Sequence, residues 1–357
     1  MDMNYGGGGY NAPPGGGAYY PQRSPLEEAR LRERKALFRS CSKLGALLLI
    51  YALLQYVFKY VYYGVVATVS SGSFNLMPWQ SLKYLREHQE IVSGSSFSMG
   101  GNLSIVFFSM LILMLIARFA MKIDLSEMAK PEKRHFKQAV KWFPLCMLLN
   151  IAVSYVITIL ENYLSSVGVN MPDVDFTIQE PSDLAITLQF VYVILIGPLA
   201  EELLYRGLVL SLLKPYGNWL AVLFSSLIFG LMHGNVPQAA SAFASAMVAG
   251  MIAIKCNSVI PTLIIHIMNN TIASYTDFAE VIGWPYASEI LMAIEIIVLF
   301  AGLFVLFVYG WQIVSTKDGK FALTFGQRVT AVFTNILMLV YFLYELYGFF
   351  TSFINAN

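Results

Sequence analysis

The chain has 357 residues; 57% are hydrophobic, only 13% are charged, and the formal net charge is +1. Soluble globular proteins carry roughly 25% charged residues, so a large part of this surface must face something other than water. The small net charge argues against a nucleic-acid partner. The three cysteines, Cys41, Cys146 and Cys256, have no paired spacing and are odd in number, which argues against a disulfide framework and a zinc–thiolate site.

The N-terminal segment is of low complexity and rich in glycine, tyrosine and proline. A segment of this composition buries too little apolar surface to offset the entropy lost on ordering. We therefore predict a disordered tail over residues 1–35. Because arginines and lysines gather at its end, we place this tail in the cytoplasm.

Nine apolar segments follow, and a bilayer core of about 30 Å requires about 20 such residues per helix. They lie within residues 44–66, 103–121, 142–160, 184–212, 219–233, 238–254, 259–275, 289–312 and 329–353. The sequence thus predicts an all-α, polytopic transmembrane bundle of eight or nine helices, with broken helices among the shorter segments from 219 onward. Two connections, 78–92 and 124–141, mix apolar and polar residues as helices on a membrane surface do.

The basic residues predict the orientation of these segments, because lysine and arginine concentrate on the cytoplasmic side. They gather before the first segment, after the second, and in connections that include Lys214, Lys255 and Lys320. The connections 161–183 and 277–289 are acidic and carry no lysine or arginine. This alternation predicts a cytoplasmic N-terminus and nine crossings.

Two adjacent glutamates, Glu201 and Glu202, interrupt the fourth segment, and Arg206 follows. Ionisable residues inside a membrane cost about 2.5 kcal/mol or more on insertion scales, so they indicate function. Glu202 and Arg206 are i, i+4 neighbours on a helix and can form a neutral pair. Glu201 is rotated by about 100° from Glu202 and lacks this partner, so it is a candidate general base. Taken alone, Glu201 could equally lie in a wet crevice at the membrane interface.

Two of the four histidines, His233 and His266, also lie in apolar segments. A single membrane histidine more often forms a hydrogen bond between helices. His266 and Asn270, however, are i, i+4 neighbours and project from one helix face. Together with Glu201, these residues can supply a base, an imidazole that holds water, and donors for an oxyanion.

Three motifs therefore occur in order: Glu-Glu-x-x-x-Arg at 201–206, Phe-x-x-x-His at 229–233 and His-x-x-x-Asn at 266–270. They resemble the motifs of the CPBP family, which includes the CAAX prenyl endopeptidases and the bacterial Abi, bacteriocin-immunity-associated proteins. Each motif is weak by itself, but all three in order on successive segments are specific. The resemblance covers a catalytic core over 184–275. It lies between N-terminal transmembrane helices with interfacial segments (36–183) and C-terminal transmembrane helices (276–357).

The resemblance implies an intramembrane endopeptidase, and the tail and short body favour the bacterial branch and its plasma membrane. Glu201 together with His233 would activate water, while His266 and Asn270 would polarise the scissile carbonyl in an intramembrane cavity. The residues expected to hold the geometry of this site are Glu202, Arg206 and Phe229. The substrate would be a membrane-embedded or lipid-modified peptide or protein, and nothing in the sequence identifies it further.

No cofactor is expected, although zinc is an alternative. The chain has no His-Glu-x-x-His motif, so a zinc ion would need His233, His266 and either Glu201 or Glu202 as ligands. The first choice would remove the carboxylate required as base, and the second would break the pair with Arg206. Two other functions use the same residues: a non-hydrolytic scaffold or immunity-type protein of this fold, and a transporter with a relay of ionisable groups. No internal repeat supports the transporter.

If the helices were straight, Glu201 and His233 would lie at different depths in the membrane. Counted at about 1.5 Å per residue from position 219, His233 falls near the outer side, whereas Glu201 falls near the cytoplasmic side. We therefore predict a helix break at Gly234–Pro237 inside a protein-lined cavity.

Other polar residues in the apolar segments have simpler interpretations. Asn150, Gln189 and Asn335 are expected to form hydrogen bonds between helices. Glu295 and Glu345 lie near predicted membrane edges and are expected to reach an interface.

Overall fold

The computed structural model describes residues 23–74, 77–172, 182–316 and 318–356, and every regular element within these ranges is a helix. Seven of the described helices are long and apolar enough to cross a membrane. They are α1 (Pro25–Ser71), α4 with its π-helical end η1 (Ser95–Ala120), α5 (Lys133–Ser166), the stretch from α6 to η4 (Asp183–Tyr216), α10 (Val236–Cys256), α13 (Ala287–Val314) and α15 (Ile336–Ala356). Two shorter apolar helices are α9 (Asn218–Leu231) and α11 (Ile260–Ala273). These helices correspond to the nine apolar segments, and the predicted all-α polytopic bundle is confirmed.

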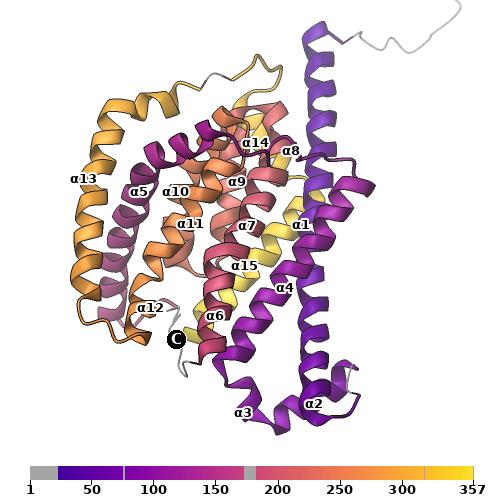
Figure 1. The fold of residues 1–357 in the computed structure, drawn as a ribbon. Coiled ribbons are helices and arrows are strands. Elements are labelled where there is room, and N and C mark those ends of the chain that lie inside the picture. Colours follow the sequence, from indigo (N-terminus) through magenta and orange to yellow (C-terminus); the bar gives the residue numbers. More distant parts are fainter. Residues whose placement is uncertain (1–22, 75–76, 173–181, 317, 357) are drawn as a thin grey trace, which may run out of the picture.

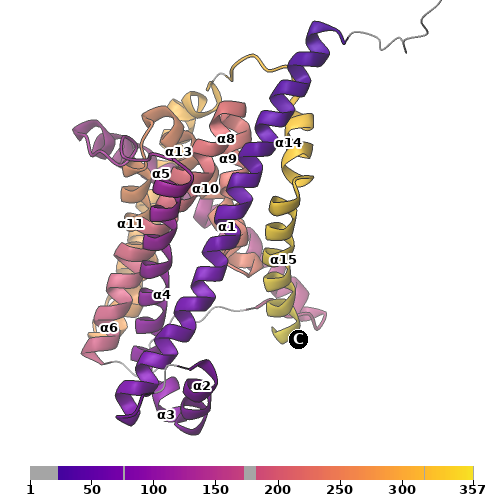
Figure 2. The same cartoon turned by 90° about the vertical axis from the view of Figure 1, so that its right-hand side faces the viewer.

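The bundle has α1 at one edge, where it lies between α4 and α15 (Figure 2). At the opposite edge α13 packs on α5, and α5 packs in turn on α10 and α11 (Figure 1). In α10, 56% of the most apolar window is buried, compared with 17% in α13 and in α15. The centre of the protein is therefore built from α5, α9, α10 and α11, and the outer helices leave most of their apolar surface for lipid.

The helix α1 begins within the predicted tail. Ser24 Oγ accepts a hydrogen bond from the Glu27 backbone N–H at 3.3 Å, and the Glu27 carboxylate accepts one from the Ser24 N–H at 2.8 Å. This capping box starts the helix. The prediction of disorder over 1–35 was therefore wrong for residues 25–35, where a local capping signal is present, and residues 1–22 lie outside the described residues.

The two connections expected on the membrane surface differ. The connection 78–92 forms two short helices, α2 (Pro78–Glu87) and α3 (Gln89–Val92). Over 124–141 the first half forms turns and the second half is the start of α5, so a helix is present in only part of the predicted stretch. The Glu132 side chain caps α5, so the chain continues from these turns directly into a membrane helix.

Most of the connections that carry basic residues lie together at the end of the bundle from which α1 starts (Figure 1). Lys214 Nζ donates to Asn257 Oδ1 at 3.0 Å, which joins the end of the α6–η4 stretch to the α10–α11 connection. Ser258 Oγ donates to the Met128 carbonyl at 2.9 Å, which joins the α4–α5 connection to the same group. Lys83 and Arg86 on α2 lie at the opposite end.

A break separates α9 from α10, as predicted. The helix α9 ends at Leu231, and Gly234 adopts a φ of 68°, a left-handed conformation that glycine tolerates. The Asn235 side chain then caps α10 by accepting a hydrogen bond from the Gln238 N–H at 2.9 Å. The 14 residues of α9 span about 21 Å, which is less than the hydrocarbon core of about 30 Å.

The short α9 removes the conflict in depth. The transmembrane stretch that contains Glu201 ends at Tyr216, and α9 starts at Asn218. The number of residues from Glu201 to Tyr216 equals the number from Asn218 to His233. Both ends lie at the basic end of the bundle, because only Gly217 separates them. Glu201 and His233 therefore lie at similar depth without a large tilt, and the conflict arose from treating 219–233 as a complete crossing.

Glycine at position 302 allows α13 to approach α5 closely. A Cβ atom at Gly302 would lie 2.5 Å from the Pro144 carbonyl oxygen and 2.6 Å from Leu148 Cβ. We expect Gly302→Ala to destabilise the protein by about 1–3 kcal/mol, as overpacking does, measured as unfolding in detergent. Gly348→Ala on α15 is the matched control, because a Cβ there meets nothing within 4 Å. Equal stability of the two variants would contradict this close approach.

Candidate active site

A cavity of about 710 Å³ lies among α5, the α6–η4 stretch, α10, α11 and α13. Its lining contains the four residues predicted as catalytic and the three predicted to support them. These are Glu201, Glu202, Arg206, Phe229, His233, His266 and Asn270. The structure thus brings together side chains from three separate segments of the chain.

The two glutamates lie on α7 (Gly197–Glu202), a short α-helical piece between two π-helical stretches, η2 (Val191–Ile196) and η3 (Leu203–Val209). Pro198 is the second residue of this piece, and a proline removes a backbone donor and displaces the carbonyl of the preceding turn. π-Helical turns inside α-helices occur frequently at functional sites. The proline therefore gives a local reason for the widened helix in front of the carboxylates.

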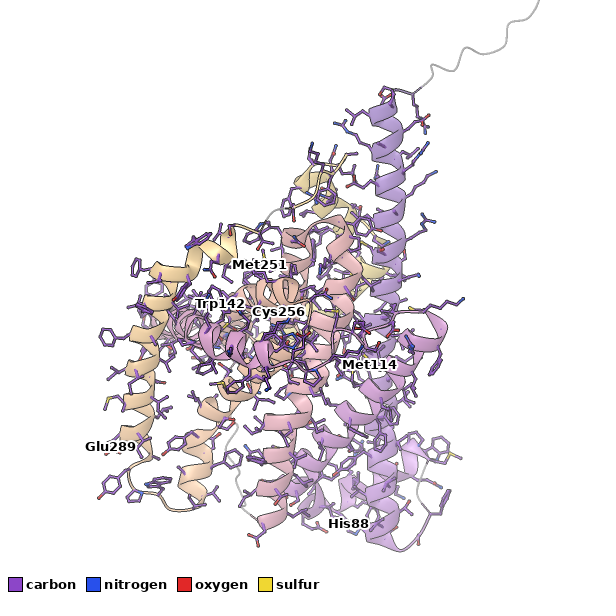
Figure 3. The ribbon with its side chains drawn as sticks, turned by 45° about the horizontal axis from the view of Figure 1, so that its top comes forward. His88, Met114, Trp142, Met251, Cys256 and Glu289 are labelled. Atoms are coloured by element: carbon purple, nitrogen blue, oxygen red, sulfur yellow. The ribbon has the colours of Figure 1, made fainter. Side chains whose placement is uncertain are left out.

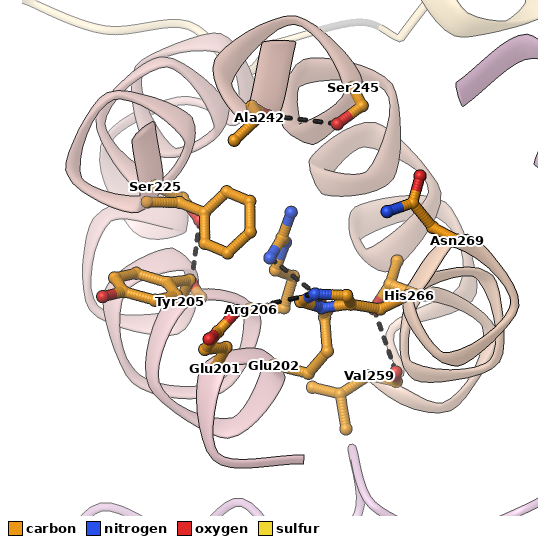
Figure 4. Close-up of polar contacts among 12 residues, drawn as sticks. Glu201, Glu202, Tyr205, Arg206, Ser225, Ala242, Ser245, Val259, His266 and Asn269 are labelled. Atoms are coloured by element: carbon orange, nitrogen blue, oxygen red, sulfur yellow. Dashed lines mark hydrogen bonds and ion pairs between the residues drawn. The ribbon is translucent and has the colours of Figure 1, made fainter. Parts of the chain in front are cut away.

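Glu202 is the anchor of a buried polar network and is only 1% exposed. Its Oε1 accepts a hydrogen bond from Arg206 Nη1 at 2.8 Å and another from His266 Nδ1 at 3.0 Å (Figure 4). The predicted pair of Glu202 with Arg206 is present. A charged pair out of water requires such additional hydrogen bonds to offset its desolvation, and His266 supplies one.

His266 connects the two glutamates, which the sequence analysis did not predict. Its Nδ1 faces Glu202, and its Nε2 lies 3.5 Å from Glu201 Oε2. Because the Glu202 oxygen can only accept, Nδ1 carries a hydrogen, and Nε2 is the ring nitrogen that faces Glu201. The side chain of Glu201 is 23% exposed, compared with 2% for Glu202, so Glu201 is the carboxylate open to the cavity.

The Phe229 ring packs against the basic side chains of the site. The Arg206 guanidinium carbon lies 4.6 Å from the centre of its ring, a cation–π contact. His233 and His266 meet the same ring edge-on, with centroid separations of 5.2 and 5.7 Å. One phenyl ring thus contacts all three basic side chains and separates the two imidazoles.

His233 is oriented by the end of α9. Its Nδ1 lies 2.9 Å from the Phe229 carbonyl oxygen, one of the acceptors that a helix end leaves without an intrahelical partner. A carbonyl only accepts, so Nδ1 is the donor and Nε2 of the neutral ring can accept a hydrogen bond in the cavity. Within the described residues no hydrogen bond or ion pair joins His233 to Glu201.

Asn270 makes two polar contacts within the protein. Its Nδ2 donates to the Val193 carbonyl in η2 at 2.9 Å, and its Oδ1 accepts from Asn269 Nδ2 at 3.2 Å. Asn269 also lines the cavity, close to His266 (Figure 4). The sequence analysis did not single out Asn269, although it lies inside the third motif. Asn270 therefore joins α11 to η2.

The comparison with known families agrees with this site. Residues 183–272 match the family model described as "Type II CAAX prenyl endopeptidase Rce1-like", and this range contains every motif residue above. Over the region that holds the site, the chain is therefore similar to this family. No curated protein and no solved structure matches the chain.

Outside the matched region, residues 183–272, α5 and α13 complete the cavity, and the sequence analysis missed their part in it. Asn150 was expected to join helices and Glu295 to reach an interface, yet both line the cavity. Asn150, Ser154 and Thr158 repeat at i, i+4 spacing, so they form a polar stripe along α5. That spacing was the available signal for a helix face turned away from lipid.

The zinc alternative can be compared with the arrangement of these side chains. Within the described ranges, no group of three or more His, Cys, Asp or Glu side chains is placed to hold a metal ion. His266 faces Glu201, whereas His233 is directed to the Phe229 carbonyl. The proposed ligands do not form a zinc shell in this arrangement, so we derive no step through a metal.

Proposed function

We propose that the protein is an intramembrane endopeptidase that hydrolyses a peptide bond of a membrane-associated substrate with a water molecule activated by Glu201. The observation that supports this most directly is the position of His266 between Glu201 and the buried Glu202–Arg206 pair. It gives Glu201 a partner that exchanges a proton, next to a cavity large enough for a peptide segment.

In the proposed reaction, water lies between Glu201 and His233 Nε2. Glu201 removes a proton as the water oxygen bonds to the scissile carbonyl carbon, and the carbonyl oxygen becomes an oxyanion stabilised by donors of the site. The proton then moves to the amide nitrogen, the C–N bond breaks, and an amine and a carboxylic acid are released. The Asn269 and Asn270 amides of the cavity lining are the proposed donors to this oxyanion, and His266 Nε2 can join them only while it holds a proton taken from Glu201.

The competing function is a non-hydrolytic scaffold or immunity-type protein that binds a peptide in the same cavity. Purified full-length protein in lipid nanodiscs, given internally quenched peptides with and without a prenyl group, separates the two. Hydrolysis in ¹⁸O-labelled water should place one ¹⁸O atom in the new carboxyl terminus. Binding without cleavage of any peptide would favour the scaffold.

We further propose that the basic end of the bundle is cytoplasmic and that the membrane is a bacterial plasma membrane. Most acidic residues of the connection 161–183 fall at 173–181, outside the described residues. Ser165→Cys should react with a membrane-impermeant maleimide in intact cells, and Lys320→Cys only after lysis. The three native cysteines are buried, so background labelling should be low. The opposite pattern would reverse the proposed orientation.

A further inference from the structure

A carboxylate outside the matched region, Glu295 on α13, faces the cavity of the proposed active site. It is the only charged residue of α13 beyond the first turn. It lies about 12 Å along the axis from the helix start at Ala287. Ionisable residues inside membrane helices are costly and indicate function by default. The role of Glu295 therefore needs an explanation that the proposed hydrolysis does not provide.

Glu295 lacks a charge partner in the part of the chain that the structure describes. Its side chain is half-buried, and it forms no hydrogen bond or ion pair with the described residues. Arg206, the one arginine of the cavity lining, is engaged by Glu202 at 2.8 Å. The lining contains no lysine. The cavity thus has no cation available for Glu295.

The lining also includes uncharged polar side chains. The α5 stripe of Asn150, Ser154 and Thr158 lines the same cavity as Glu295 and His266, and α5 packs directly on α13 as well as on α10 and α11. A purely apolar segment bound here would leave these groups and Glu295 without partners, which is unfavourable in a low-dielectric environment. An acidic segment would be repelled by the carboxylate of Glu295.

We propose that the cavity receives a substrate segment that carries a basic side chain, whose cation pairs with Glu295 while a nearby peptide bond lies at Glu201 and His266. This inference rests on the proposed endopeptidase function and specifies its substrate class. Glu295 is then a specificity-determining residue that takes no part in bond cleavage. An ion pair inside the cavity neutralises both charges and satisfies a carboxylate that is otherwise unpaired.

Binding of designed peptides to the full-length protein in nanodiscs tests this inference. The peptides share one apolar sequence and carry, at a position moved along the chain, lysine, the uncharged norleucine or glutamate. At one position we expect lysine to bind about tenfold more tightly than norleucine, as for a partly buried charge pair. Glu295→Gln should remove this preference, and Glu295→Lys should transfer it to the glutamate peptide. Glu289→Gln is the matched control, because Glu289 is exposed at the outer end of the same helix (Figure 3).

Equal binding of lysine and norleucine peptides at every position would overturn the inference, as would a lysine preference that persists in Glu295→Gln. Because the readout is binding, its failure is distinguishable from failure of the proposed function. A preference for lysine that depends on Glu295, without cleavage of any peptide, would contradict the peptidase and support the inference. Cleavage without any charge preference would support the peptidase and contradict the inference.

Discussion

Glu201→Gln is expected to lower kcat/KM for peptide hydrolysis by about a hundredfold or more, the usual effect of losing a general base. Glutamine keeps the size of the side chain and can still donate to or accept from His266 Nε2, which lies 3.5 Å away. It cannot take a proton from water. The unfolding temperature should therefore remain close to that of the wild-type protein, because Glu201 is outside the buried pair with Arg206.

Two controls show whether the loss of activity comes from losing the general base, from a change in folding or from a metal ion. Glu289→Gln makes the same chemical change at an exposed position and should keep full activity. Inhibition by a chelator, with recovery on adding zinc, would move the activation of water from Glu201 to a metal ion. A Glu201→Gln enzyme with wild-type kcat/KM would remove the catalytic role assigned to this residue.

Glu202→Gln is expected to destabilise the protein by about 3–5 kcal/mol, because it leaves a buried cation without its counter-charge. Arg206 is 2% exposed and Glu202 is 1% exposed, so water cannot replace the lost carboxylate. Activity should fall as well, because His266 loses the anionic acceptor that orients its ring. Unfolding by denaturant in detergent, together with the peptide assay, measures both effects.

A double variant distinguishes the structural contribution from the catalytic one. Glu202→Leu combined with Arg206→Met replaces the ion pair with apolar side chains, a change that is often neutral for stability. We expect it to recover most of the stability lost in Glu202→Gln but to remain inactive. If Glu202→Gln unfolds like the wild-type protein, the pair does not carry a buried charge of the kind described above.

The features that could be predicted from the sequence are those determined within one segment. Nine apolar segments follow from hydrophobicity over about 20 residues, and each has a helix in the structure. The pairing of Glu202 with Arg206 follows from helical periodicity alone, since residues four apart share a face. The break after His233 follows from Gly234 and the cap at Asn235. The capping box that starts α1 was equally local and was overlooked.

The tertiary structure alone decided which of these segments face one another. His266 contacts Glu202 across 64 positions of sequence and reaches Glu201 with its other ring nitrogen. The Asn270 amide is directed to the Val193 carbonyl, and Glu295 lines the cavity. These contacts depend on the rotation, depth and crossing of helices from distant parts of the chain, which packing between helices sets and which no periodicity within a single helix contains.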